Sequence, residues 1–439
     1  MVKESYYKEI LKLILPSLAA TLFTGIYIIV DGLFIGQAMG DIGLAAMNIV
    51  WPVAAVILAI GFGVGTASGI LITINQEKGK TDEVNKIITS FFLVVAFYSL
   101  LVLLLYFVKE PLLLAIGADD STLDPAIRYL KLYLFCGVIQ ILSCGLTPIM
   151  RNYKHHNAAA NFLVISVVIN FIGDYLFMMK FGWELVGAAF ASILSQAFYV
   201  IAAIIFLIKK KKLNFNWHLD FKLIGTIMLK GIAPFILNYA SSLIIIFYNV
   251  FSFNYGKTEA VAAYTVVAYI IYIPQYISTG ITEGIQPLIT KQYALKTKKE
   301  MIYFRKSLLL SLLTLSALSI LFIVLKEPVA RLYNLSSEAT SIYNDAFFFF
   351  TLSFPAIGIS RAFISLFCAL SKDAAANMLV LIEPIITPLI LWMFTEFAGL
   401  KGVWISFLVI QIILVIMALM IYLISSKISK KREEMSRDS

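Results

Sequence analysis

Charged residues are scarce in this chain. Asp, Glu, Lys and Arg make up 14% of its 439 residues, against roughly 25% in soluble domains. Hydrophobic residues make up 60%, and the mean hydropathy is +0.89. A soluble fold of this length could not bury so much apolar surface, because its exterior must still be solvated. The composition excludes a water-soluble globular protein and predicts a protein whose solvent is lipid.

Cysteine residues and cofactor motifs are also scarce. The three cysteines, Cys136, Cys144 and Cys368, lie inside apolar runs, and their odd number favours small buried side chains over a disulfide or metal site. No Walker loop, zincin motif, nucleophile elbow or haem motif occurs in the sequence. We therefore expect no enzymatic activity and no cofactor, and energy input from an ion gradient rather than from ATP.

Long apolar stretches fill most of the chain. A helix needs about 20 such residues to cross the hydrocarbon core, and uniform hydrophobicity without a period of two favours helices over a β-barrel. We predict an all-α polytopic membrane protein with twelve transmembrane helices. The predicted spans are residues 10–37, 43–74, 87–108, 126–150, 157–181, 184–208, 223–252, 258–290, 307–325, 344–370, 373–397 and 402–426.

Basic residues gather in alternate loops, such as Lys209–Lys212. Loops rich in lysine and arginine face the cytoplasm, which predicts a plasma-membrane protein with both termini cytoplasmic. The opposite loops hold few basic residues, and one of them is acidic, with Glu110, Asp119, Asp120 and Asp124. The formal charge of +9 is then a signal for topology, and we expect no nucleic-acid partner.

The chain contains an internal repeat. The segment Ala158–Val164 recurs as Ala374–Val380, and Lys109–Pro111 recurs as Lys326–Pro328. The register holds along each half, which indicates a six-helix unit used twice, related by a pseudo-twofold axis along the membrane normal. The predicted domains are an N-lobe at 1–208, a cytoplasmic linker at 209–222, a C-lobe at 223–426 and a basic cytoplasmic tail at 427–439.

Ionisable side chains inside the predicted spans are functional candidates, because placing them in lipid is costly. At about 1.5 Å per helical residue, Asp31, Asp174 and Ser192 lie near ~10 Å below the outer surface. Asn170 and Asp174 share one helix face, as do Tyr27 and Asp31, because each pair is four residues apart. These five residues form our candidate site for a coupling ion.

Two chemistries fit this cluster of polar side chains. Carboxylate, amide and hydroxyl oxygens suit a hard cation such as Na⁺. Alternatively, desolvation and mutual repulsion lead two close carboxylates to hold a proton between them. The residue types leave Na⁺ and H⁺ open, and they also permit simple hydrogen bonding between neighbouring helices.

The second half of the chain carries different polar residues. Asn249 stands at the repeat position of Asp31, so the two halves have diverged chemically. Arg361 and Glu383 each lie about eleven residues from the same inner loop, and therefore at similar depth. A structural ion pair between them is the simplest interpretation.

A further acid follows in the second half, in the segment 282–287, which reads Thr-Glu-Gly-Ile-Gln-Pro. Glu283 lies close to Pro287, which frees a backbone carbonyl of the helix. The candidate residues for a substrate or proton site in the C-lobe are Asn249, Glu283, Gln286, Arg361 and Glu383.

Three motifs stand out: Pro16 fifteen residues before Asp31, Asn170-x3-Asp174 ahead of Tyr-Leu-Phe, and the segment 284–287, Gly-Ile-Gln-Pro. Together with the doubled six-helix unit, they resemble the MATE (multidrug and toxic compound extrusion) family over almost the whole chain. The resemblance implies a cation site in the branch with an acidic N-lobe. On this sequence that site comprises Asp31, Asn170, Asp174 and Ser192, with Tyr27 beside it, and Ser192 stands where that branch has threonine.

We therefore expect an antiporter that exports organic, cationic or amphipathic compounds while H⁺ or Na⁺ enters, by alternating access. Its expected partners are small organic substrates and the lipid bilayer, and we expect a monomer. The alternative is a flippase of related architecture for lipid-linked saccharides. The anionic diphosphate of such a substrate calls for several cavity-facing arginines or lysines, whereas Arg361 is the one basic candidate inside the spans. An intramembrane protease, a channel or a receptor explains the doubled unit less well.

Overall fold

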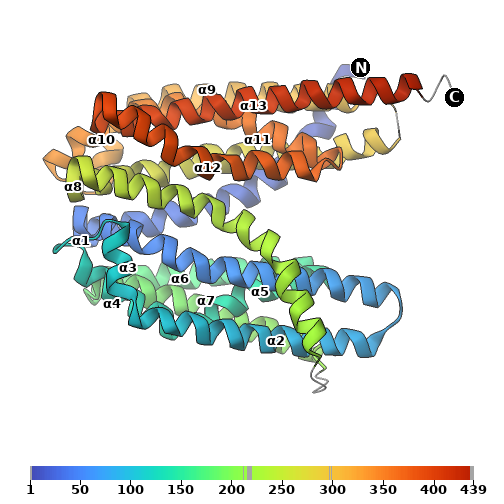
Figure 1. Ribbon diagram of the computed structural model, residues 1–439, viewed down its shortest axis with the longest axis horizontal. Helices are drawn as coiled ribbons and strands as arrows, with labels where there is room; N and C mark the ends of the chain where they lie inside the picture. The colour runs from blue at the N-terminus through green and yellow to red at the C-terminus, as the bar shows by residue number, and fades with distance from the viewer. Residues whose placement is uncertain (1, 211, 215–219, 296, 298, 436–439) are drawn as a thin grey trace. The chain divides into compact units, whose positions relative to one another are not determined.

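Every regular element that the computed structural model describes is helical, which confirms the all-α prediction (Figure 1). The structure describes residues 2–210, 212–214, 220–295, 297 and 299–435. Parts of the predicted linker, residues 211 and 215–219, and of the predicted tail, residues 436–439, lie outside this range.

The helices follow the predicted spans closely. In the first half they are α1 (Val2–Glu77), α2 (Thr81–Leu104), η1 (Leu105–Phe107), α3 (Lys109–Ile116), α4 (Leu123–Phe135), α5 (Gly137–Asn152), α6 (His156–Asp174), η2 (Tyr175–Lys180) and α7 (Glu184–Lys209). In the second half they are α8 (Phe221–Ala294), α9 (Glu300–Leu332), α10 (Ser337–Leu352), α11 (Phe354–Ala369), α12 (Asp373–Ala398) and α13 (Leu400–Met435).

The described helices provide eight to ten candidate membrane crossings by length and composition. Eight are long and apolar enough to cross, and the bent pairs α4–α5 (63°) and α10–α11 (42°) bring the number to ten. At about 1.5 Å per residue, α1 with 76 residues and α8 with 74 are far longer than one crossing requires. Each leaves helical geometry partway, α1 at Gly40 and α8 at Gly256 and Lys257. Counting these two helices twice gives the predicted twelve.

The chain divides into two compact units. Unit 1 comprises Met1–Gly32 and Asn254–Ser439, and unit 2 comprises Leu33–Phe253. These boundaries differ from those of the predicted lobes, because α1 and α8 each pass from one unit into the other. The start of α1 packs with the second half of the chain, and the start of α8 packs with the first half.

Buried contacts hold the start of α8 in unit 2. The Asn48 side-chain amide of α1 donates to Asn249 Oδ1 at 2.7 Å, and Asn249 Nδ2 donates to the Asn48 carbonyl at 3.0 Å. Further along, α1 and α8 touch through backbone: a Cβ on Gly63 would lie 2.6 Å from the Gly231 carbonyl oxygen. Glycine at this crossing permits the close approach of the two helices.

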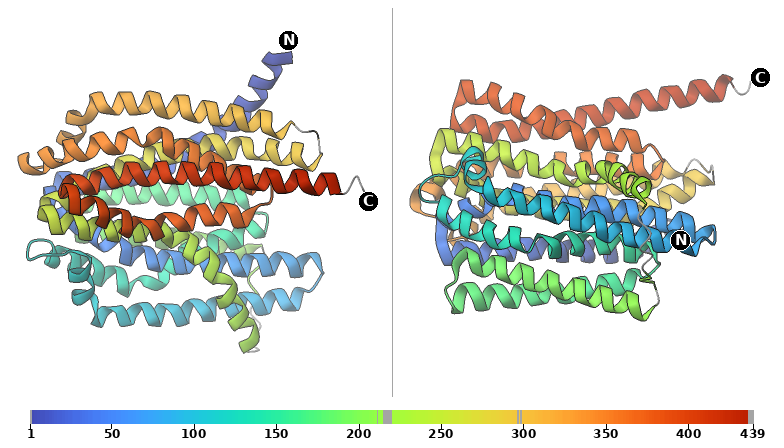
Figure 2. Two further views of the ribbon diagram at one scale, coloured as in Figure 1. Left: turned by 45° about the horizontal axis from the view of Figure 1, so that its top comes forward. Right: turned by 60° about the horizontal axis from the view of Figure 1, so that its bottom comes forward.

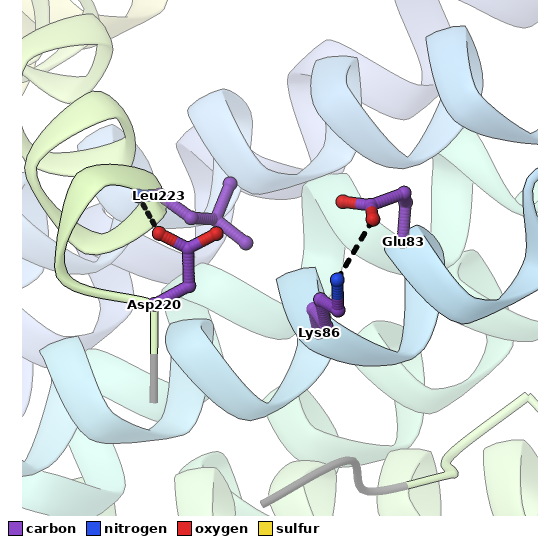
Figure 3. Close-up of polar contacts among 4 residues, drawn as sticks. All are labelled: Glu83, Lys86, Asp220 and Leu223. Carbon is purple, nitrogen blue, oxygen red and sulfur yellow. Dashed lines mark hydrogen bonds and ion pairs between the residues drawn. The ribbon is translucent and has the colours of Figure 1, made fainter. Parts of the chain in front are cut away.

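Polar groups also fix the first turn of α8 (Figure 3). The Asp220 carboxylate accepts a hydrogen bond from the Leu223 backbone N–H at 3.0 Å, which caps the N-terminus of the helix. On α2, Lys86 Nζ lies 2.9 Å from Glu83 Oε1 and interacts electrostatically with Asp220. The charge on α2 therefore favours the position of this cap within unit 2.

The core of unit 1 explains why the start of α1 belongs there. Ile14 of α1 is buried in an apolar cluster that also contains Phe304 of α9 and Phe363 and Phe367 of α11. The Phe304 and Phe363 rings meet at a centroid distance of 5.2 Å. Burial of apolar side chains at about 25 cal/mol per Å², together with this close packing, stabilises the segment within unit 1.

Candidate functional site

The most concentrated group of predicted site residues lies between α6 and α7, which run side by side in unit 2 (Figure 2). Asn170 and Asp174 stand one turn apart on α6, and each is only 1% exposed. The Asn170 side-chain amide donates to Ser192 Oγ of α7 at 3.5 Å, the long end of hydrogen-bond distances. The structure thus brings Asn170 and Ser192 together and buries Asp174 on the same helix face.

Small residues permit this close contact between the two helices. A Cβ on Gly173 of α6 would lie 2.8 Å from the Ala191 Cβ of α7. Two turns before Asp174, Ser166 Oγ donates to the Ser195 carbonyl at 2.7 Å. We call the polar residues along this interface the α6–α7 seam: Ser166, Asn170 and Asp174 on α6, and Ser192, Ser195 and Gln196 on α7.

The seam carries buried acceptors. Among the described residues, Asn170 Oδ1 and Gln196 Oε1 are buried and accept no hydrogen bond. Leaving a buried acceptor unsatisfied costs about 1–3 kcal/mol, which a cation or a donating ligand would offset. The sequence does not single out Gln196 as a site residue by charge or depth. The signal that could have found it is the internal repeat, in which Gln196 matches Gln411.

The side-chain oxygen atoms of the seam are suitable ligands for a hard monovalent cation. The amide oxygen of Asn170, the hydroxyl of Ser192 and the carboxylate of Asp174 are all oxygen ligands, as such cations prefer. Within the described part of the chain, no group of three or more His, Cys, Asp or Glu side chains could hold a metal ion. The oxygen ligands of the seam suit Na⁺ or a proton.

The backbone changes its geometry directly after Asp174. The α-helical part of α6 ends at this residue, and Tyr175–Lys180 form the π-helical segment η2. Wide turns of this kind are rare and frequently mark functional sites. Hydropathy predicts a continuous helix over residues 157–181, because a uniform apolar run carries no signal for a local change in the backbone hydrogen-bond pattern.

Helix α1 contacts α6 and η2 through aromatic side chains of unit 2 that stand next to seam residues in the sequence. The Phe34 ring lies 5.6 Å from the Phe171 ring and 6.4 Å from the Tyr175 ring, between centroids. Asp31, three residues before Phe34, belongs to unit 1, and the side chain of Tyr27 lies outside the described residues. The participation of Asp31 and Tyr27 in the cation site stays a prediction.

In the second half, Glu383 pairs with an amide rather than with arginine. Gln411 Nε2 of α13 donates to Glu383 Oε1 of α12 at 2.7 Å. Arg361 forms no ion pair within the described part of the chain, although its charge acts on Glu383 at longer range. The expected direct ion pair between Arg361 and Glu383 is therefore absent, because the nearer Gln411 occupies the carboxylate.

The remaining C-lobe candidates are separated. Asn249 is 0% exposed and belongs to unit 2, where both of its side-chain polar atoms bond Asn48. This reciprocal pair links α1 and the first part of α8, and a substrate role for Asn249 stays a prediction. Glu283 is exposed and Gln286 half-buried on α8 in unit 1, and Glu283 interacts electrostatically with Cys368 of α11.

An apolar cavity of about 330 Å³ lies elsewhere in unit 2, between α1, α2 and α8. Its lining includes the Gly63–Gly231 crossing, Tyr98 of α2, and Ile232 and Phe235 of α8. Such a lining offers contacts to hydrocarbon and aromatic groups but no charge for a cation.

Comparison with known proteins gives a consistent family. The MatE family model matches residues 16–176. The chain is 22% identical to the multidrug export protein MepA of Staphylococcus saprophyticus over 447 residues, which cover 99% of this chain and 97% of that protein. It is 24% identical to MepA of Staphylococcus aureus over 453 residues, with the same coverage. The chain is thus similar to these multidrug export proteins over nearly its whole length, and to the MatE family model over residues 16–176.

The fold agrees with that of a MATE transporter of known structure. The inward-facing conformation of a multidrug resistance MATE family transporter of the MOP superfamily matches with a TM-score of 0.84 and 17% identity, over 95% of this chain and 99% of that chain. This similarity shows that the chain has the fold of that transporter.

Proposed function

We propose that this chain is a MATE-family transporter that exports organic, cationic or amphipathic compounds in exchange for an entering cation, H⁺ or Na⁺. The two staphylococcal relatives are named multidrug export proteins, which supports export of organic compounds. The observation that carries the coupling proposal is the α6–α7 seam, where a buried carboxylate lies one turn from an amide oxygen that accepts no hydrogen bond.

In this proposal Asp31 joins Asn170, Asp174 and Ser192 around the coupling ion, with Tyr27 beside them. The ion neutralises the buried carboxylates, and its entry provides the free energy for export. One elementary charge moving down 100 mV is worth ~2.3 kcal/mol, enough for about fiftyfold accumulation. Alternating access then exposes the site to one side of the membrane at a time.

Topology and substrate contact complete the proposal. Both termini are cytoplasmic, since the basic loops lie on the side of the termini, and the protein acts as a monomer. In the second half, the exposed Glu283 is our candidate for contact with a cationic substrate, with Gln286 one turn away. Glu383 and Arg361 are alternatives for a substrate or proton site in the C-lobe, and the proton would be held by Glu383 because arginine stays protonated.

The test is ethidium accumulation by everted membrane vesicles, driven separately by a Na⁺ gradient and by a pH gradient. We expect at least one gradient to drive uptake, and Asp174→Asn to abolish it. Asp345→Asn is the matched control, because Asp345 is an exposed carboxylate that pairs with Lys401 at 3.4 Å. Wild-type uptake by Asp174→Asn would contradict the site, and uptake that responds to neither gradient would contradict antiport.

A further inference from the structure

Two tyrosines of unit 1 contact the segment of α1 that carries Asp31. Tyr333 directly follows α9, and Tyr269 lies on the second part of α8. Their rings stack with a centroid distance of 6.1 Å and 9° between the ring planes. We call this pair the tyrosine clamp.

The clamp contacts α1 on both sides of Asp31. The Tyr333 hydroxyl donates to the Ile29 carbonyl oxygen at 3.3 Å. At Gly32, a Cβ would lie 2.5 Å from Cε2 of the Tyr269 ring. Because any side chain at this position would displace the ring, glycine permits Tyr269 to lie directly on the α1 backbone.

The burial of Tyr333 makes the hydrogen bond of its hydroxyl group costly to lose. Tyr333 is 1% exposed, and a buried phenol needs a partner for its O–H. In a low-dielectric interior such a bond is stronger than in water, and its loss is more costly. The clamp therefore fixes the backbone two residues before Asp31 and one residue after it.

We propose that Tyr333 and Tyr269 are positioning residues for the coupling ion. They set the rotation and depth of Ile29–Gly32, and thereby the place of the Asp31 carboxylate. The inference rests on the proposed function, in which Asp31 binds the ion. Neither tyrosine needs to touch the ion, because the clamp acts through the α1 backbone.

The experiment measures ethidium uptake by everted vesicles as a function of the concentration of the coupling ion, which is Na⁺ or H⁺. Tyr333→Phe keeps the ring and removes the hydroxyl. Tyr343→Phe is the matched control, because Tyr343 is 0% exposed and its hydroxyl has no hydrogen-bond partner among the described residues. We expect Tyr333→Phe to raise the ion concentration for half-maximal uptake about two- to tenfold, the effect of one hydrogen bond, while Tyr343→Phe stays at the wild-type value.

Gly32→Ala tests the other half of the clamp and should shift the half-maximal ion concentration in the same direction. Equilibrium binding of ethidium to purified protein should be unchanged in Tyr333→Phe. A purely structural role would lower the yield of folded protein without moving the half-maximal ion concentration, and that result would overturn the proposal.

The Asp31→Asn variant distinguishes failure of the proposed coupling site from failure of the tyrosine clamp. Loss of ion-driven uptake in Asp31→Asn together with the shift in Tyr333→Phe supports both. Loss in Asp31→Asn with wild-type ion dependence in Tyr333→Phe overturns the clamp alone. Wild-type ion dependence in Asp31→Asn overturns the coupling site, and the positioning role with it.

Discussion

Single side chains in the α6–α7 seam separate the two candidate coupling ions. A Na⁺ ion would use the Ser192 hydroxyl as a neutral ligand, whereas a proton held by carboxylates needs no hydroxyl. The 3.5 Å contact from Asn170 is long enough that this hydroxyl is weakly engaged within the protein. Ser192 is therefore the most informative residue for ion identity.

We predict that Ser192→Ala weakens Na⁺-driven uptake several-fold, in line with a lost interaction of ~1 kcal/mol, and leaves proton-driven uptake nearly unchanged. Uptake is measured against Na⁺ concentration at fixed pH. Ser307→Ala serves as control, because Ser307 is a buried serine whose hydroxyl donates to the Phe304 carbonyl of its own helix at 2.8 Å. Equal Na⁺ dependence in wild type and Ser192→Ala would contradict a Na⁺ site at this hydroxyl.

A histidine at the start of α6 predicts a dependence of stability on pH. The His155 ring packs edge-on against Phe206 at 5.1 Å between centroids. Burial, and then the charges of Lys210 and Lys212, lower the pKa of His155 below its usual 6.5. The folded state thus favours the neutral imidazole, and its contribution to stability is present above pH 6.5 and lost as the pH falls below that value.

We predict that the melting temperature of the protein in detergent falls between about pH 6.5 and 5, and that His155→Gln reduces this fall. The glutamine side chain is neutral throughout and has a similar reach. Melting curves of both proteins at pH 5 and pH 7.5 provide the measurement. An identical fall in both proteins would assign the effect to other groups.

Whole helices are held in place by a small number of polar pairs. The start of α8 bonds α1 through Asn48 and Asn249, each of which satisfies the other. Removal of one partner leaves the second amide buried and unsatisfied, which costs about 1–3 kcal/mol. This reciprocal pair therefore acts as one unit.

We predict that Asn249→Ala destabilises the protein by about 1–3 kcal/mol and that adding Asn48→Ala costs much less than a second such loss. Asn238→Ala is the control on the same helix, because Asn238 is exposed and donates to the Pro234 carbonyl of its own helix at 2.8 Å. Thermal unfolding in detergent is measured for the wild type, the two single variants, the double variant and the Asn238→Ala control. Full additivity of the two single changes would argue against a coupled pair.

At the scale of the whole molecule, the sequence predicts the properties that each helix has on its own, such as its span and the residues that share one of its faces. The twelve spans follow from hydropathy, and the placement of Asn170 and Asp174 on one helix face follows from their spacing. Contacts between helices are a different matter. Hydropathy and repeats contain no information on which unit the ends of α1 and α8 join, and depth alone could not show that Gln411 lies nearer to Glu383 than Arg361 does.

The exchange of helix ends predicts that the two halves do not fold independently. A fragment of residues 1–214 lacks the part of α8 that contacts Asn48 and Gly63, and a fragment of residues 220–439 lacks Ile14. We expect each fragment alone to aggregate in detergent, and the two expressed together to form a stable complex. Size-exclusion chromatography of each sample measures this. A monodisperse fragment 1–214 would contradict the prediction.

The division of α1 between the units also has a consequence for synthesis on the ribosome. Residues 33–253 are complete once the start of α8 has emerged, whereas residues 1–32 pack with a segment that ends at residue 439. At 5–20 residues per second, about 400 further residues take roughly 20–80 s to synthesise. For that time the first segment of the nascent chain, including Asp31, lies in the membrane without its final neighbours. The first helix to be made is thus among the last to be finished.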